Sequence, residues 1–277
     1  MSGKRSTFLL SALVFGFAFL YVPILLVMIY SFNEGKLVTV WTGFSTKWYV
    51  SLFSNDGMID AAWNSLRIGV MSATLALALG TPAGLVMSRF GRFKGRTLFS
   101  GMIAAPLVMP EVITGRSLLL LFVTLEQMVG WPAGRGISTI TIAHTTFCAA
   151  YVAVVVQSRL SGMDTSVEEA AMDLGAKPAK IFFVITLPMI LPALLAGWLL
   201  SFTLSLDDLV IASFVAGPGS TTLPMKVFSS VRLGVSPEIN ALATLIILAV
   251  SAMILISSLL ILRSERNRSR ASSTEET

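Results

Sequence analysis

Four charged side chains lie deep inside apolar stretches of this sequence: Glu111, Arg116, Asp207 and Asp208. A charge at the centre of a bilayer costs on the order of 2.5–3.5 kcal/mol on insertion scales, so such residues usually have a function. Carboxylates can replace the water around a primary ammonium, which keeps its charge at neutral pH. These residue types therefore predict contact with a cationic amine. Pairing between helices, which would hold them in register, is the alternative.

Helical geometry separates the two neighbouring aspartates. Adjacent residues of a helix point about 100° apart, so Asp207 and Asp208 cannot both face one ligand unless the helix is broken. Ser201, Ser205 and Asp208 fall on one face with small and polar groups. We expect this face to line a pathway, with Asp207 left to pair with Arg116 or with a partner subunit.

The acidic residue of the third apolar stretch is placed by the rise of a helix. At about 1.5 Å per residue, Glu111 lies about 21 Å from the start of its stretch at Thr97, past the midplane. Arg116 then lies at a depth similar to that of the two aspartates, and an ion pair between them is possible. Because Arg116 would repel a cation, we expect it to neutralise an acid or to face an aqueous edge.

The elements that carry these residues are membrane spans. The 277 residues are 55% hydrophobic and only 13% charged, about half the charge of an ordinary soluble domain, which excludes a cytosolic enzyme and a disulfide-stapled secreted protein. Cys148 is the only cysteine. The predicted fold is all-α, a polytopic membrane protein of one transmembrane domain (1–277) with six helices. Six stretches have the length of a span: 8–30, 62–88, 97–125, 138–158, 189–216 and 240–262.

The placement of lysine and arginine predicts the orientation of these spans. Thirteen of the 20 basic residues fall on the side of both termini and five on the opposite side, so both ends are expected in the cytoplasm. The first stretch is too long for a signal-peptide core, which favours a retained anchor. The tail at 263–277 is rich in Ser, Arg and Glu and is expected to be a disordered cytoplasmic segment.

The connection at 159–188 is too regular to be a slack loop. Ser166 and Glu169 have the spacing of a capping box, Gly175 can end a helix with positive φ, and Pro178 can open a second one. The second helix is expected to end at the membrane at Leu187-Pro188. An apolar stripe runs along the first helix at Val167, Ala170, Ala171 and Leu174. The pattern alone leaves open whether this stripe lies on lipid or meets another protein.

The same connection resembles a family signature. Glu169-Ala170-Ala171, Gly175, Ile185 and Leu187-Pro188 stand at the spacing of the motif in binding-protein-dependent ABC importer permeases, and the resemblance covers roughly 62–262. It implies the type I ABC importer permease fold, located in the inner membrane. It also implies that residues 166–177 form a coupling helix that docks on an ATPase subunit. The coupling residues would be Ser166, Glu168, Glu169, Ala170, Ala171, Leu174, Gly175 and Lys177.

Further segments resemble the polyamine-uptake permeases, most closely those for putrescine. They are KLVTVW at 36–41, APLVMPEVITG at 105–115, SLDDLVIASFVAGPG at 205–219 and PEINALATL at 237–245. This resemblance implies import of putrescine, or alternatively of spermidine or another small cation. The implied partners are a second, homologous permease, a dimer of ATPase subunits that binds ATP and Mg, a periplasmic polyamine-binding protein and membrane lipid.

Other functions find less support in the residues. The sequence has no Walker-type phosphate loop, so this chain is not expected to hydrolyse ATP or to hold a cofactor. His144 is the only histidine, which excludes a zinc site built from several histidines and favours a hydrogen-bonded residue within a span. The basic charge is explained by topology rather than by nucleic acid. An intramembrane aspartyl protease and a stand-alone secondary transporter remain as the competing classes.

Overall fold

The computed structural model describes residues 2–37, 40–233, 236–252 and 255. The predicted tail at 263–277 lies outside the described residues. The chain divides into two compact units, one formed by residues 1–56 and 229–277 and the other by residues 57–228. Within the described residues the regular structure is helical, and five helices are long and apolar enough to cross a membrane.

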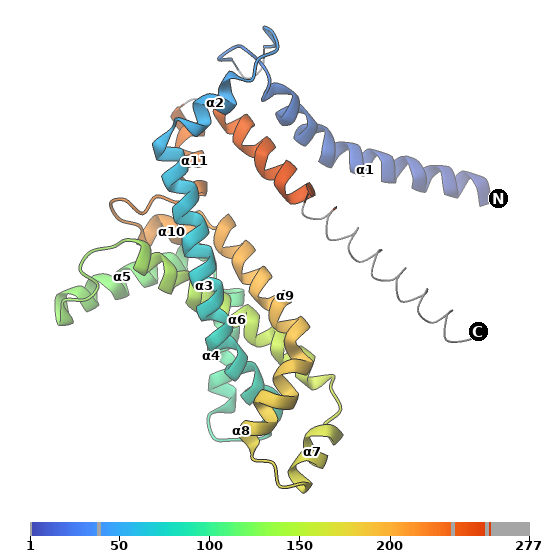
Figure 1. The fold of residues 1–277 in the computed structure, drawn as a ribbon, viewed down its shortest axis with the longest axis vertical. Helices are drawn as coiled ribbons and strands as arrows, with labels where there is room; N and C mark the ends of the chain where they lie inside the picture. The colour runs from blue at the N-terminus through green and yellow to red at the C-terminus, as the bar shows by residue number, and fades with distance from the viewer. Residues whose placement is uncertain (1, 38–39, 234–235, 253–254, 256–277) are drawn as a thin grey trace, which may run out of the picture. The chain divides into compact units, whose positions relative to one another are not determined.

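The first unit holds α1 (Ser2–Tyr30), α2 (Lys47–Phe53) and a helix at Pro237–Ala252 (Figure 1). The loop after α1 is ordered by one buried amide. Asn33 donates through Nδ2 to the carbonyls of Leu37 and Val40, and its Oδ1 accepts from the backbone N–H of Thr42. The indole N–H of Trp48 donates to the Asn33 carbonyl.

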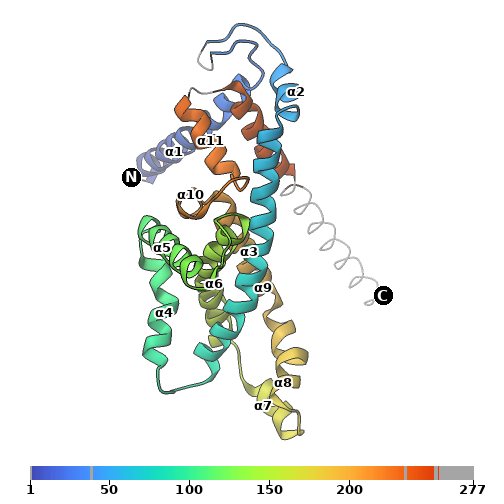
Figure 2. The ribbon, with the colours of Figure 1, turned by 90° about the vertical axis from the view of Figure 1, so that its left-hand side faces the viewer.

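The second unit contains most of α3 and the helices from α4 to α10, and α11 (Leu223–Leu233) continues beyond it (Figure 2). Its core surrounds α6, whose buried residues face α9 and α10. The helices in chain order are α3 (Asp56–Arg89), α4 (Arg96–Val108), α5 (Glu111–Val129), α6 (Ile137–Ser161), α7 (Ser166–Asp173), α8 (Pro178–Ile181), the π-helical turn η1 (Phe182–Thr186), α9 (Leu187–Asp207) and α10 (Val210–Val215).

Close approach of α3 to α6 depends on two glycines one helical turn apart. A Cβ on Gly80 would lie 2.7 Å from the carbonyl oxygen of Ala149, and one on Gly84 would lie 2.6 Å from that of Ala153. Neither distance is tolerated, because the obstacle is backbone that cannot rotate away. Small residues at this spacing let helix backbones pack closely in membranes, where no hydrophobic force drives helices together.

The predicted third span is wrong as one continuous helix. The structure breaks it into α4 and α5 at Met109-Pro110, where Met109 is extended with ψ of 135°. The helical region is disfavoured for a residue before proline, because that residue contacts the proline ring. The predicted fifth span is also broken, at Asp208, which has ψ of 123° and is not followed by a proline. The first, second and fourth predicted stretches agree with helices in place and differ at their ends, and the sixth agrees with a helix over 240–252, beyond which most of it lies outside the described residues.

The expected helix end at Leu187-Pro188 is also wrong. Helical structure runs without interruption from Pro178 to Asp207. The chain passes Pro188 by widening into the π turn η1 immediately before it. A proline inside a helix crowds the carbonyl four residues earlier and provides no N–H, and a local π turn accommodates both defects. The short helix α8 is therefore the base of the span that continues as α9.

Candidate functional site

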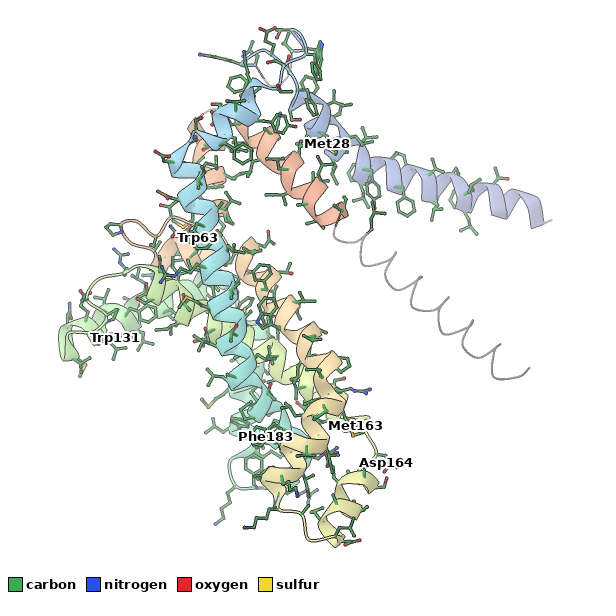
Figure 3. All side chains as sticks on the ribbon, viewed as in Figure 1. Met28, Trp63, Trp131, Met163, Asp164 and Phe183 are labelled. Carbon is green, nitrogen blue, oxygen red and sulfur yellow. The ribbon has the colours of Figure 1, made fainter. Side chains whose placement is uncertain are left out.

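The hairpin of α7 and α8 lies at one end of the second unit, at the end of α9 opposite α10 (Figure 1). Met163 and Asp164 mark the turn that leads from α6 into α7 (Figure 3). Among the described residues of α7 none is buried, and Val167 and Leu174 are 48% and 89% exposed. The predicted apolar stripe is thus uncovered within this chain.

The predicted capping box at Ser166 is wrong, because the helix begins one residue earlier than that capping box requires. Helix α7 begins at Ser166 itself, and the carboxylate of Asp164 accepts from both the backbone N–H and the hydroxyl of Ser166. These two hydrogen bonds lower the pKa of Asp164 from its ordinary value. Glu169 accepts a hydrogen bond from the hydroxyl of Thr165. A signal for this start was present in the sequence, because an aspartate two residues before a helix forms such a turn readily.

The end of α7 agrees with the prediction. Gly175 has φ of 81°, a left-handed conformation that glycine adopts without steric cost. Its N–H donates to the carbonyl of Met172, and the N–H of Ala176 donates to that of Ala171. This pair of bonds closes the helix and directs the chain toward Pro178, the first residue of α8. Ala170, Gly175 and Lys177 are exposed, and Ala171 is half-buried.

Glu168 differs from the other predicted coupling residues because its carboxylate points into the molecule. One oxygen lies 3.2 Å from Nε of Arg89 at the end of α3, and the other accepts from the hydroxyl of Thr186 at 2.8 Å. The side chains of Arg89 and Glu168 are only 18% and 14% exposed. Sequence reasoning missed this contact because the three residues are far apart along the chain.

A second polar cluster lies at the break between α9 and α10. His144 of α6 places Nδ1 2.7 Å from Oγ of Ser205 and Nε2 3.1 Å from Oδ2 of Asp208. A carboxylate oxygen accepts, so the Nε2–H of His144 donates to Asp208, and the hydroxyl of Ser205 is the hydrogen-bond partner of Nδ1. His144 is therefore a hydrogen-bonded residue within a span, as predicted. The pairing of His144 with Ser205 was not anticipated.

Asp208 also caps the short helix that follows it. Its Oδ1 accepts from the backbone N–H of Ile211 at 3.2 Å, and its Oδ2 accepts from that of Ala212 at 2.7 Å. Because α9 ends just before Asp208, the carboxylate of Asp208 can point along the axis of α10. The first N–H groups of α10 have no acceptor within that helix. All the oxygens of this carboxylate are thereby engaged inside the chain.

The predicted pathway residues fall into a buried group and an exposed group. Ser201, Ser205 and Asp208, which were predicted to line a pathway, are 0%, 5% and 9% exposed and face the core around α6. Asp207 and Glu111 are exposed, and Glu111 is the first residue of α5. Among the described residues no ion pair joins Arg116 to Asp207 or Asp208, so the pair that the sequence left possible does not form within this part of the chain.

The structure is therefore that of an all-helical membrane protein with apolar spans. Two of the predicted spans are interrupted, one at a proline and one at an aspartate, and a hairpin is exposed at one end. Residues 80–270 match the family model described as "Binding-protein-dependent transport system inner membrane component". The chain belongs to this family of inner membrane transport components.

Curated relatives match nearly the whole chain. It is 62% identical over 266 residues to the putrescine transport system permease protein PotI of Escherichia coli K12, covering 96% of this chain and 95% of the relative. It is 44% identical to the spermidine/putrescine transport system permease protein PotC of the same organism, covering 89% of this chain and 90% of the relative.

Solved structures support the fold. A chain of a bacterial ABC transporter that imports the acidic polysaccharide alginate superposes with a TM-score of 0.69 at 17% identity, covering 94% of this chain and 97% of that chain. A chain of the inward-facing MetNI methionine ABC transporter gives 0.59 at 18% identity, covering 75% and 95%. At these identities the likeness concerns the fold alone.

Proposed function

We propose that this chain is a permease subunit of an ATP-driven importer that moves putrescine across the inner membrane by alternating access. The observation that carries the proposal is the 62% identity to a putrescine permease over almost the full length of both chains. The chain is a permease and not an enzyme, because its relatives are permease subunits and its sequence has no phosphate-binding loop. ATP and Mg are bound by separate ATPase subunits.

The proposed topology has six spans with both termini in the cytoplasm. It counts α4 and α5 together as one crossing, because α4 has only 13 residues and a span needs about 20. The sixth crossing begins in the helix at Pro237–Ala252, which is too short to count among the five long apolar helices. The excess of basic residues on the side of the termini supports this orientation.

The coupling function is assigned to residues 166–177. Two features support it: Val167 and Leu174 are uncovered apolar residues on a helix that has no buried residue, and Gly175 fixes the turn that exposes them. An exposed apolar face at the end of a membrane bundle is typical of a protein interface. Closure of an ATPase dimer around ATP would pull on this hairpin and open the permease on the other side.

The substrate pathway is assigned first to Asp207 and Glu111. These carboxylates are exposed, so they can replace water around an ammonium group, whereas that of Asp208 is occupied by His144 and α10. Ser201, Ser205 and Asp208 then shape the break in the helix and position Asp207 beside it. The second permease and the periplasmic binding protein supply the parts of the pathway that this chain does not.

The test is ATP-dependent uptake by proteoliposomes that contain this chain with its second permease, its ATPase subunits and its binding protein. We expect radiolabelled putrescine to accumulate only when ATP is present on the side of the membrane where the ATPase subunits lie. We also expect all subunits to co-purify in mild detergent. Competition by unlabelled putrescine and spermidine ranks the two substrates, and stronger competition by spermidine would reassign the preferred amine. Uptake by this chain alone under an ion gradient would show a secondary transporter and refute the proposal.

A further inference from the structure

The carboxylate of Glu168 joins three separate helical segments. Its Oε2 lies 3.2 Å from Nε of Arg89 at the end of α3, and its Oε1 lies 3.4 Å from a terminal nitrogen of the same guanidinium. The Oε1 atom also accepts from the hydroxyl of Thr186 in η1 at 2.8 Å. We call these three side chains, Arg89, Glu168 and Thr186, the Glu168 junction.

This junction is a buried polar attachment of α7 to α3 and η1. Helix α7 has no buried residue, so apolar packing contributes little to holding it. Beneath it lies a cavity of about 170 Å³, mostly apolar, lined by residues that include Leu85, Met172 and Phe182 as well as the junction itself. Helix α7 also lies against α8 and η1, and the junction adds the link to α3, so a motion of α7 reaches α3 at that cluster.

The third member of the junction lies on an irregular part of its span. Thr186 is 3% exposed and ends the π turn at Phe182–Thr186, just before Pro188. A π turn within an α-helix is rare and is frequently found at functional positions. Because the span continues without interruption to Asp207, a pull on Thr186 acts on the base of the helix that carries the proposed pathway residues.

We propose that Glu168 is a positioning residue for transport. It transmits the motion of the ATPase-docking helix α7 to α3 through Arg89 and to α9 through Thr186. The inference rests on the proposed function, and it assigns to Glu168 a role different from docking on the ATPase. Both side chains of the ion pair are largely buried, so water screens the pair less than it would on the surface and the link is stiffer than an exposed pair.

The test measures putrescine molecules taken up per ATP hydrolysed by the complete complex in proteoliposomes. Glu168→Gln and Arg89→Gln each remove the charge attraction, and we expect each to lower this ratio by roughly tenfold, within the range of energetic coupling between distant sites. Arg92→Gln is the matched control, because Arg92 is an exposed arginine in the connection between α3 and α4, three residues after Arg89. It should leave the ratio unchanged.

A charge exchange separates coupling from folding. Arg89→Glu combined with Glu168→Arg restores the pair in reverse, and the hydroxyl of Thr186 can accept from an arginine as well as donate to a carboxylate. We expect this double variant to recover most of the ratio lost in the single variants. Thr186→Val keeps the size of the side chain and should lower the ratio less than Glu168→Gln does.

The outcomes distinguish the inference from the proposed function. If the wild-type complex takes up no putrescine with ATP, the proposed function fails. If wild-type uptake is normal and Thr186→Val and Glu168→Gln retain the wild-type ratio, the inference is overturned. If the single glutamine variants do not assemble, Thr186→Val decides alone, since it alters neither charge nor size, and an unchanged ratio refutes the role of the junction.

Discussion

Removing the carboxylate of Asp208 should destabilise the break between α9 and α10 more than any other single change in this region. Asp208→Ala leaves the N–H groups of Ile211 and Ala212 without an acceptor and His144 without its buried partner. Loss of an N-terminal helix cap costs about 0.5–2 kcal/mol, and leaving a buried hydrogen-bond partner unsatisfied costs about 1–3 kcal/mol. We expect a total loss of about 2–5 kcal/mol from the two costs together.

The assay is thermal unfolding of the purified complex in detergent, with Asp208→Asn and Asp207→Ala as comparisons. For a chain of this size, 1 kcal/mol corresponds to roughly 2–4 °C, so Asp208→Ala should lower the midpoint by about 10 °C. Asp208→Asn keeps one acceptor oxygen and should lose less than half as much. Asp207→Ala removes an exposed carboxylate and should change stability by less than about 0.5 kcal/mol. Equal midpoints for Asp207→Ala and Asp208→Ala would refute the division of roles between the two aspartates.

Three further predictions concern packing, coupling and the pathway. Gly84→Val should prevent assembly of the complex, seen as loss of the co-eluting peak in size-exclusion chromatography, whereas Gly101→Val should not, because a Cβ at Gly101 meets nothing within 4 Å. Gly175→Val forces a branched residue into φ of 81°, and we expect uptake to fall while ATP hydrolysis and assembly persist; normal uptake would remove the turn from the coupling path. Asp207→Asn should raise the KM for putrescine uptake, and unchanged kinetics would show that this carboxylate does not meet the substrate.

The sequence correctly predicted those features that depend on local chemistry. Gly175 and Pro178 define the end of one helix and the start of the next because each restricts or frees its own backbone angles. The apolar stretches were recognisable because a bilayer requires about 20 apolar residues in succession. The predicted start of α7 was wrong by one residue, because Asp164, Thr165 and Ser166 are all residue types that can cap a helix. Only the hydrogen bonds in the structure show which of them do so.

The prolines were noticed in the sequence, but their effects were not predictable from it. Pro110 ends α4, because Met109 has been forced into an extended conformation. Pro188, in contrast, does not end a helix, because the π turn before it absorbs the crowding and the span continues. Proline thus ends a helix at one position and is accommodated within a helix at the other. The packing of the surrounding helices decides which conformation has the lower free energy.

The sequence alone determined that this chain spans the membrane, where its exposed hairpin lies and which acids are costly to bury. The tertiary structure alone decided which acid is free. Asp207 and Asp208 are adjacent and chemically identical, but Asp208 turns into the chain, where His144 and the N–H groups of α10 hold it, and Asp207 remains exposed. The difference arises because hydrogen-bond partners far apart in the sequence meet only after α6 and α9 have packed together.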